Sequence, residues 1–227
     1  RSPSRGLGDV YKRQISHSSL NQTKVELIIA SSIDGRIAFP DGDATNFGSH
    51  EDKKILNECL SNLDATIFGS GTLKAHQSTF LVKENNYIST KQPVSIVAGN
   101  INNFSKEWLY FKQPIKRWLI NSNNSNKNKN HYFFEKEFSF LGNWEKTLKL
   151  IKKEGISNIG LLGGTKLINA FIQENLIDEI KITIVPKIIG GKFSWIPPLS
   201  KQNNYGRSQN WIIKSVKELN TNEIFIH

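Results

Sequence analysis

Short apolar runs that lead into glycine-containing turns recur along this chain, and they limit its possible folds more than any other feature. Residues 25–30, 64–69 and 158–162 are rich in aliphatic and β-branched side chains, and each run leads into a turn that contains glycine. Runs of this length, bounded by glycine, are typical of buried strands. The chain has 227 residues, of which 37% are apolar, and this is enough to bury such strands in a core.

Helical patterns alternate with these runs. Ser49 is expected to cap a helix whose apolar residues recur at helical spacing as far as Leu63, and Asn143 is expected to cap a helix that ends near Glu154. A third helix is predicted over residues 165–173. Further strands are predicted over residues 93–98, 115–121, 131–135, 179–185, 210–216 and 223–226. The last two are expected to form an antiparallel pair. The alternation predicts an α/β fold with three layers.

Two segments stand apart from this pattern. Residues 1–14 lack apolar periodicity, and residues 9–14 resemble a translated transposon end from a sequencing library, so we expect residues 1–14 to be non-native. Residues 121–130 are almost entirely Asn, Ser and Lys, which predicts an exposed loop. We therefore expect a single domain over residues 24–227.

Charge and cysteine content favour some classes of protein over others. The net charge of +10 suggests nucleic-acid binding, but the lysines are scattered and form no basic stripe with interleaved aromatic residues. No run reaches the roughly 18 uncharged apolar residues of a membrane helix, so we expect no membrane span. Cys59 is the only cysteine, which excludes an internal disulfide and a cysteine-rich zinc cluster. A cytoplasmic protein without a metal site is expected.

Three turns are candidates for ligand binding because they follow predicted strands, where open α/β sheets bind ligands. The first spans residues 31–38, the second is Gly69-Ser70-Gly71-Thr72, and the third spans residues 162–165 with two consecutive glycines. Small residues let a backbone approach a phosphate or a nicotinamide, and amides at a helix N-terminus attract a pyrophosphate. Each turn taken alone also fits a simple chain reversal or close packing of a strand on a helix.

Taken together, these turns resemble a known family. The segments that match are residues 32–38, 64–65, 69–72, 162–167, 176–179 and 186–191, in the family's order and approximate spacing. The chain resembles the reductase domain of riboflavin biosynthesis, which forms the C-terminal half of bifunctional RibD, and most of all the stand-alone cyanobacterial type. The resemblance implies a dihydrofolate-reductase-like fold with a mixed, mostly parallel sheet, NADPH as cofactor and a homodimer. It also implies a substrate, 5-amino-6-(5-phosphoribosylamino)uracil or a related ribosylaminopyrimidine, whose ribosyl group is reduced to ribityl.

The resemblance also implies roles for individual residues. Asp34 and Glu179 would be catalytic, and Ser32 would contact substrate. The substrate phosphate needs a cation, for which Arg36 and Lys53 are candidates, along with Lys54 and Lys74. The cofactor would be lined by Gly69, Gly71, Thr72, Gly163, Gly164, Thr165 and Leu167. For Asp34 and Glu179, a purely solvated acid at a turn or strand start is the alternative interpretation.

The sequence departs from the family pattern in ways that affect the substrate more than the cofactor. Relatives commonly carry an aspartate where this chain has His76, and many carry an arginine near the positions of Leu60 and Asn62. A dihydrofolate or pterin reductase of the same fold is therefore an alternative within enzymes. A basic nucleic-acid-binding domain is an alternative of another class.

Overall fold

The computed structural model describes residues 23–45, 47–102, 104–121, 133–196 and 211–227. The main strands are β1 (Lys24–Ser32), β2 (Ala65–Gly69), β5 (Val94–Ala98), β6 (Arg117–Asn121), β7 (Lys136–Ser139), β8 (Asn158–Gly163), β9 (Glu179–Val185), β10 (Val216–Leu219) and β11 (Glu223–Ile226). A separate hairpin comprises β3 (Lys83–Glu84) and β4 (Tyr87–Ile88). The helices are α2 (His50–Ser61), α3 (Ser70–His76), α4 (Leu109–Lys112), α5 (Trp144–Lys153) and α6 (Thr165–Gln173).

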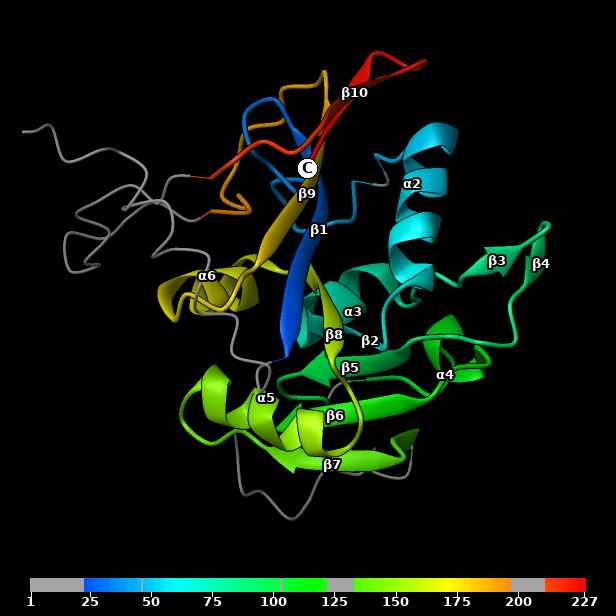
Figure 1. Ribbon diagram of the computed structural model, residues 1–227, viewed down its shortest axis with the longest axis vertical. Helices are drawn as coiled ribbons and strands as arrows, with labels where there is room; N and C mark the ends of the chain where they lie inside the picture. Colours follow the sequence, from blue (N-terminus) through cyan, green and yellow to red (C-terminus); the bar gives the residue numbers. More distant parts are fainter. Residues whose placement is uncertain (1–22, 46, 103, 122–132, 197–210) are drawn as a thin grey trace, which may run out of the picture.

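One nine-stranded sheet has the order β10-β11-β9-β1-β8-β2-β5-β6-β7 (Figure 1). The strands from β9 to β7 in this order run parallel, and β11 runs antiparallel to both β9 and β10. The predicted mixed, mostly parallel sheet is therefore confirmed. β8 lies between β1 and β2 although it comes much later in the chain, so the strand order changes direction here.

Helices cover both faces of this sheet (Figure 1). On one face, α5 and α6 bury Trp144, Ile151 and Phe171 against Leu27 and other strand residues. On the other face, α2 packs through Ile55, Cys59 and Leu60 against β1, while α3 and α4 cover β2 and β5. The predicted three layers result from these two apolar faces.

The helix starts follow the expected chemistry. Ser49 Oγ accepts a hydrogen bond of 3.1 Å from the Asp52 amide, and Asn143 Oδ1 accepts one of 2.9 Å from the Lys146 amide, which confirms both predicted caps. By contrast, α3 and α6 begin after Gly69 and Gly164 with no side-chain cap. Their first amides therefore have no side-chain acceptor.

Several predictions differ from the structure in position. Residues 131–132 and 210 of two expected strands lie outside the described residues. Within the described residues these strands begin at Lys136 and Val216, because each is limited by its pairing with one neighbour. The helices α3 and α4 and the β3–β4 hairpin were not predicted, since they are too short to show periodicity. The expected non-native segment 1–14 lies outside the described residues, as does the expected loop 121–130 except for Asn121.

No helix among the described residues is both long and apolar enough to cross a lipid bilayer. Within the same residues, no three His, Cys, Asp or Glu side chains gather in a way that could hold a metal ion.

Candidate active site

A cavity of about 1700 Å³ lies where β1, β2, β5 and β8 reach their carboxyl ends. This is the place where the strand order changes direction, and ligands of open α/β sheets bind at such points. Pockets for one small molecule usually enclose about 300–1,000 Å³. The cavity therefore has room for two ligands side by side, as a cofactor and a substrate require.

The glycine turns after β2 and β8 meet in the floor of this cavity. A Cβ added to Gly69 would lie 3.6 Å from the Gly164 nitrogen, and one added to Gly164 would lie 2.9 Å from Thr72 Oγ1. A Cβ added to Gly71 would contact nothing within 4 Å, because this glycine faces the open space of the cavity. The two turns are distant in sequence but in contact in the fold. We refer to residues 69–72 and 163–165 as the glycine floor.

Helix starts give the glycine floor an affinity for anions. Gly164 is the residue before α6, and no side chain caps this helix. The Thr165 hydroxyl is directed elsewhere, since it donates a hydrogen bond of 2.6 Å to the Ser194 carbonyl. Uncapped amides at a helix start carry partial positive charge and bind phosphate groups. Leu167, in the first turn of the same helix, also lines the cavity.

The charged side chains that line the cavity are mostly cations. They are Lys53, Lys166, Lys181, Lys192 and Asp52. Among the described lining residues, four ammonium groups thus face a single carboxylate. Such an excess of positive charge favours ligands that carry phosphate groups.

The comparison with known proteins agrees with this geometry. A model of the family "RibD C-terminal domain" matches residues 23–223. The chain belongs to this family. It is 27% identical over 199 residues to the riboflavin biosynthesis protein RibD of Buchnera aphidicola, an alignment that covers 80% of this chain and 52% of that protein. It is also 24% identical over 184 residues to the 2,5-diamino-6-ribosylamino-4(3H)-pyrimidinone 5′-phosphate reductase of Archaeoglobus fulgidus, covering 73% of this chain and 81% of that one.

Solved structures of RibD proteins share the fold. RibD of Acinetobacter baumannii superposes with a TM-score of 0.76 at 19% identity, over 92% of this chain and 58% of that one. The dihydrofolate-reductase-like fold implied by the sequence is thereby confirmed. The chain spans little more than half the length of the Buchnera and Acinetobacter RibD proteins, so it matches only one part of those longer proteins.

Of the residues predicted to contact substrate, the structure brings Lys53 to the cavity and places Ser32, Asp34 and Arg36 outside its lining. Asp34 Oδ1 accepts a hydrogen bond of 2.5 Å from the Ser32 hydroxyl, and Oδ2 accepts one of 2.7 Å from the Gly190 amide. The bond from Ser32, with those from the backbone, lowers the pKa of Asp34 to about 2. Asp34 therefore ties two loops together, and only the end of its turn, Ile37 and Ala38, lines the cavity.

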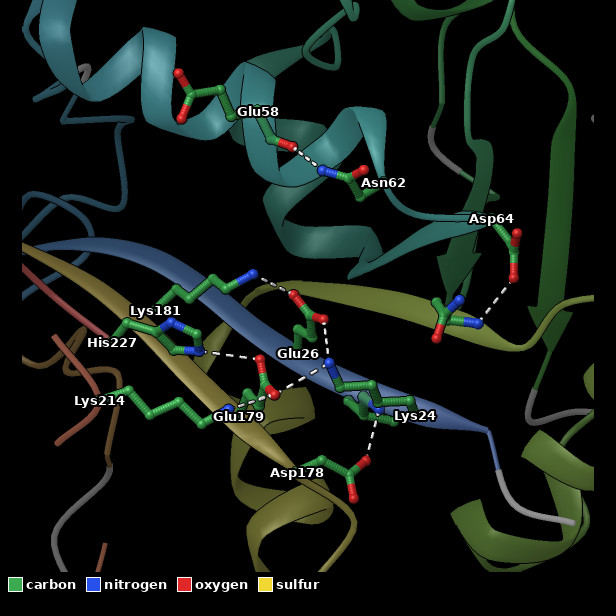
Figure 2. Close-up of polar contacts among 12 residues, drawn as sticks. Lys24, Glu26, Glu58, Asn62, Asp64, Asp178, Glu179, Lys181, Lys214 and His227 are labelled. Carbon is green, nitrogen blue, oxygen red and sulfur yellow. Dashed lines mark hydrogen bonds and ion pairs between the residues drawn. The ribbon is translucent and has the colours of Figure 1, made fainter. Parts of the chain in front are cut away.

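Glu179 also lies outside the cavity lining. Its carboxylate is 2.7 Å from Lys214 Nζ, 3.1 Å from Lys24 Nζ and 3.0 Å from His227 Nε2. Figure 2 draws these three contacts. Burial alone would raise the pKa of Glu179, but the hydrogen bonds from these three partners outweigh it and lower the pKa to about 2. Because β9 starts at Glu179 and runs parallel to β1, this residue lies at the amino end of the strand, away from the glycine floor. The structure thus gives Glu179 a role in joining strands.

Sequence reasoning missed the one carboxylate in the lining. Asp52 lies in the first turn of α2, and its side chain faces the cavity, which Lys181 and Thr183 of β9 also line. Burial raises the pKa of Asp52, the Thr183 side chain opposes this rise by a hydrogen bond, and the Glu223 charge adds to it. The alternating pattern of β9 could have placed Lys181 and Thr183 on one face, but no sequence pattern pairs them with Asp52.

His76 is a residue at which the sequence departs from the pattern expected from the family resemblance. It lies at the end of α3 and lines the cavity. Desolvation by the surrounding wall lowers the pKa of His76. At this point of the wall the chain therefore presents an imidazole whose neutral form is favoured.

Proposed function

We propose that this chain is an NADPH-dependent reductase that converts the ribosyl side chain of a phosphorylated ribosylaminopyrimidine to ribityl. The substrate would be 5-amino-6-(5-phosphoribosylamino)uracil or its 2-amino counterpart. The observation that carries the proposal is the meeting of two glycine turns in one basic cavity with room for two ligands. The names of the RibD and pyrimidinone reductase relatives support the same reaction.

The residues of the glycine floor fit the cofactor. Gly164 leaves no space for a side chain next to Thr72, and Gly71 opens onto the cavity, so a ligand can approach the backbone closely. The residues that would hold NADPH are Gly69, Gly71, Thr72, Gly163, Gly164, Thr165 and Leu167. NADPH, when bound, supplies the hydride for the reduction. Its additional phosphate, compared with NADH, suits the excess of lysines.

The remaining wall would orient the substrate and exclude water. Ile28, Ile29 and Ala30 of β1 supply an apolar surface, and Phe193 lines the loop side. Lys53 is the predicted partner that reaches the cavity, and it would bind the substrate phosphate. Positioning in a water-poor cleft is the main protein contribution to such a reduction.

The test is direct binding followed by turnover. NADPH is titrated into the protein and nicotinamide fluorescence is followed, with NADH in parallel. We expect saturation with NADPH at micromolar concentration and weaker binding of NADH. Absence of binding at high micromolar NADPH would contradict the proposal. Turnover of dihydrofolate, with none of the ribosylaminopyrimidine phosphate, would identify a folate or pterin reductase instead.

We further propose that the enzyme acts as a homodimer in the cytoplasm. Large apolar side chains are exposed on and just before the edge strand β10, among them Ile212 at 72%, Ile213 at 65% and Val216 at 60%. Exposed apolar patches and edge strands commonly mark association surfaces. Light scattering should then give twice the chain mass, and a monomeric mass would contradict the dimer. The free, buried thiol of Cys59 is consistent with a reducing compartment.

A further inference from the structure

The carboxylate of Asp52 is positioned for a ligand and not for its own helix. The N-cap of α2 is already supplied by Ser49, whose hydroxyl accepts from the Asp52 amide. The Asp52 side chain turns instead toward Thr183 on β9 and lines the cavity. Gly48 leaves the space that the carboxylate needs, because a Cβ on Gly48 would lie 2.6 Å from Asp52 Oδ2.

The neighbours of Asp52 keep this carboxylate in place. Glu223 of β11 lies behind it and is itself occupied, since it accepts hydrogen bonds from Ser49 and Thr221. Thr183 is buried and contributes the hydroxyl that bonds to Asp52. Most other side chains of this part of the wall are apolar, including Ile55 and Phe225. Asp52 is therefore a fixed polar group in a largely apolar surface.

A lysine donor completes this part of the wall. Lys181 precedes Thr183 by two residues, so the two side chains leave the same face of β9. Lys181 Nζ is 2.5 Å from Glu26 Oε2, a contact drawn in Figure 2, and this bond fixes the ammonium group while leaving it further donor capacity. The wall thus offers an acceptor at Asp52 and a donor at Lys181. A heterocycle with an N–H edge and a carbonyl matches this arrangement.

Building on the proposed reductase function, we propose that Asp52 selects the pyrimidine ring and favours a 2-aminopyrimidin-4-one over a uracil. An ionised carboxylate accepts two hydrogen bonds from the adjacent ring N–H and 2-amino group. Uracil has a carbonyl oxygen in place of the amino group, and this oxygen would face the carboxylate without a proton between them. Loss of a hydrogen bond to a charged group lowers affinity by about tenfold to hundredfold, so the uracil should bind more weakly than the 2-aminopyrimidin-4-one by a factor in this range.

Two small probes test this preference without any turnover. 2,6-Diaminopyrimidin-4-one and 6-aminouracil differ in the group at ring position 2 and in the proton that uracil carries on N1, and each is titrated calorimetrically into the full chain. We expect the diamino probe to bind at least about tenfold more tightly. Equal affinity, a preference for 6-aminouracil, or no binding of either at millimolar concentration would overturn the inference. NADPH fluorescence is measured separately, so a failure of the reductase function is distinguished from a failure of this preference.

Variants separate recognition from a merely structural role. Asp52→Asn replaces one acceptor by an amide donor, so we expect the preference to shift toward 6-aminouracil by about tenfold or more. Glu51→Gln is the matched control, since Glu51 lies in the same helical turn, pairs with Lys54 and does not line the cavity. We expect the control to keep the preference of the unchanged chain. A preference that Asp52→Asn leaves intact in a folded protein would overturn the inference.

The pH dependence gives a second readout. Protonated Asp52 would donate to the uracil carbonyl, so discrimination should fade as pH drops through the pKa of this carboxyl. Burial and the charge of Glu223 raise that pKa, whereas Thr183 and Lys53 lower it; Lys181 faces the same cavity from β9. We therefore expect the loss to begin above the ordinary aspartate range near pH 4. Discrimination that stays constant through this range would contradict the role of Asp52.

Discussion

Two polar regions of the molecule use their groups in opposite ways. The first is the glycine floor. The second is a charge cluster at the amino ends of β1 and β9, formed by Lys24, Glu26, Glu179, Lys181, Lys214 and His227. In the cluster each carboxylate has two or more basic partners, whereas the floor presents backbone amides at helix starts that no side chain caps.

The difference shows which acids are available to a ligand. Charges that are already paired stabilise the fold, and the hydrogen bonds from its basic partners lower the pKa of Glu179 to about 2. The backbone amides of the glycine floor, by contrast, gain hydrogen bonds when a ligand binds to them. Substitutions in the floor should therefore weaken binding, and substitution of Glu179, which lies outside the cavity lining, should weaken stability.

The largest expected effect is at Gly163, where substitution should lower both the free energy of unfolding and the affinity for NADPH. Its φ of +118° is a conformation that a β-branched residue avoids, so Gly163→Val should lower the free energy of unfolding by about 2 kcal/mol or more. NADPH binding should be lost together with stability. Urea denaturation followed by circular dichroism measures the first and fluorescence titration the second. An unchanged midpoint would mean that this backbone conformation is not required.

Gly71→Ala should lower the affinity for NADPH without lowering the stability of the fold. A methyl group here meets no protein atom but enters the cavity, so NADPH affinity should fall by about tenfold, which is about 1.4 kcal/mol. Stability should not fall, because alanine favours the helix α3 over glycine. Lys74→Ala on the same helix is the control, since Lys74 does not line the cavity and should leave the affinity unchanged. Wild-type affinity in Gly71→Ala would argue against a floor for NADPH.

Glu179→Gln should give the converse result. The carboxylate has three basic partners at the surface side of β9, and after allowance for solvent screening its loss should cost about 1 kcal/mol of unfolding free energy. NADPH affinity should be unchanged because Glu179 lies outside the cavity lining. Glu58→Gln serves as the control, because Glu58 is an exposed residue of α2 and its substitution removes the same charge. A loss of NADPH affinity confined to Glu179→Gln would show that the cluster contributes to binding.

The smallest expected effect is on how steeply the stability of the fold declines at acid pH. The pKa of Glu179 is lowered from 4.5 to about 2 in the folded chain, so its stabilisation is complete above pH 4.5. This stabilisation is lost as pH falls from about 4.5 to about 2. Unfolding midpoints measured across this window should decline less steeply in Glu179→Gln than in the unchanged chain. Parallel declines would indicate that Glu179 is not paired in solution.

The sequence predicted buried elements better than edges. The ranges expected for α6 and β9 agree with the structure because apolar periodicity reports burial directly. β7 and β10 were misplaced because they lie at the two edges of the sheet and most of their residues are exposed. At an edge, hydrogen bonds to one neighbouring strand decide the bounds, and these are not visible in local composition.

The site followed the same rule. The glycines were identifiable because close backbone approach requires that residue type locally. The roles of acids were not identifiable, because their partners are distant in the chain: Asp34 meets Gly190, and Glu179 meets His227. Asp52 was overlooked for the same reason, since only the folded sheet brings Thr183 to it.

The late position of β8 in the chain has a consequence for biosynthesis. β1 has only β8 and β9 as neighbours in the sheet, so a growing polypeptide exposes this apolar strand unpaired until residues 158–185 have left the ribosome. The same stretch supplies residues 163–165 of the glycine floor, so a cofactor bound there as proposed could not stabilise an unfinished chain. A nascent chain of this design would depend on chaperones for longer than one whose neighbouring strands follow each other.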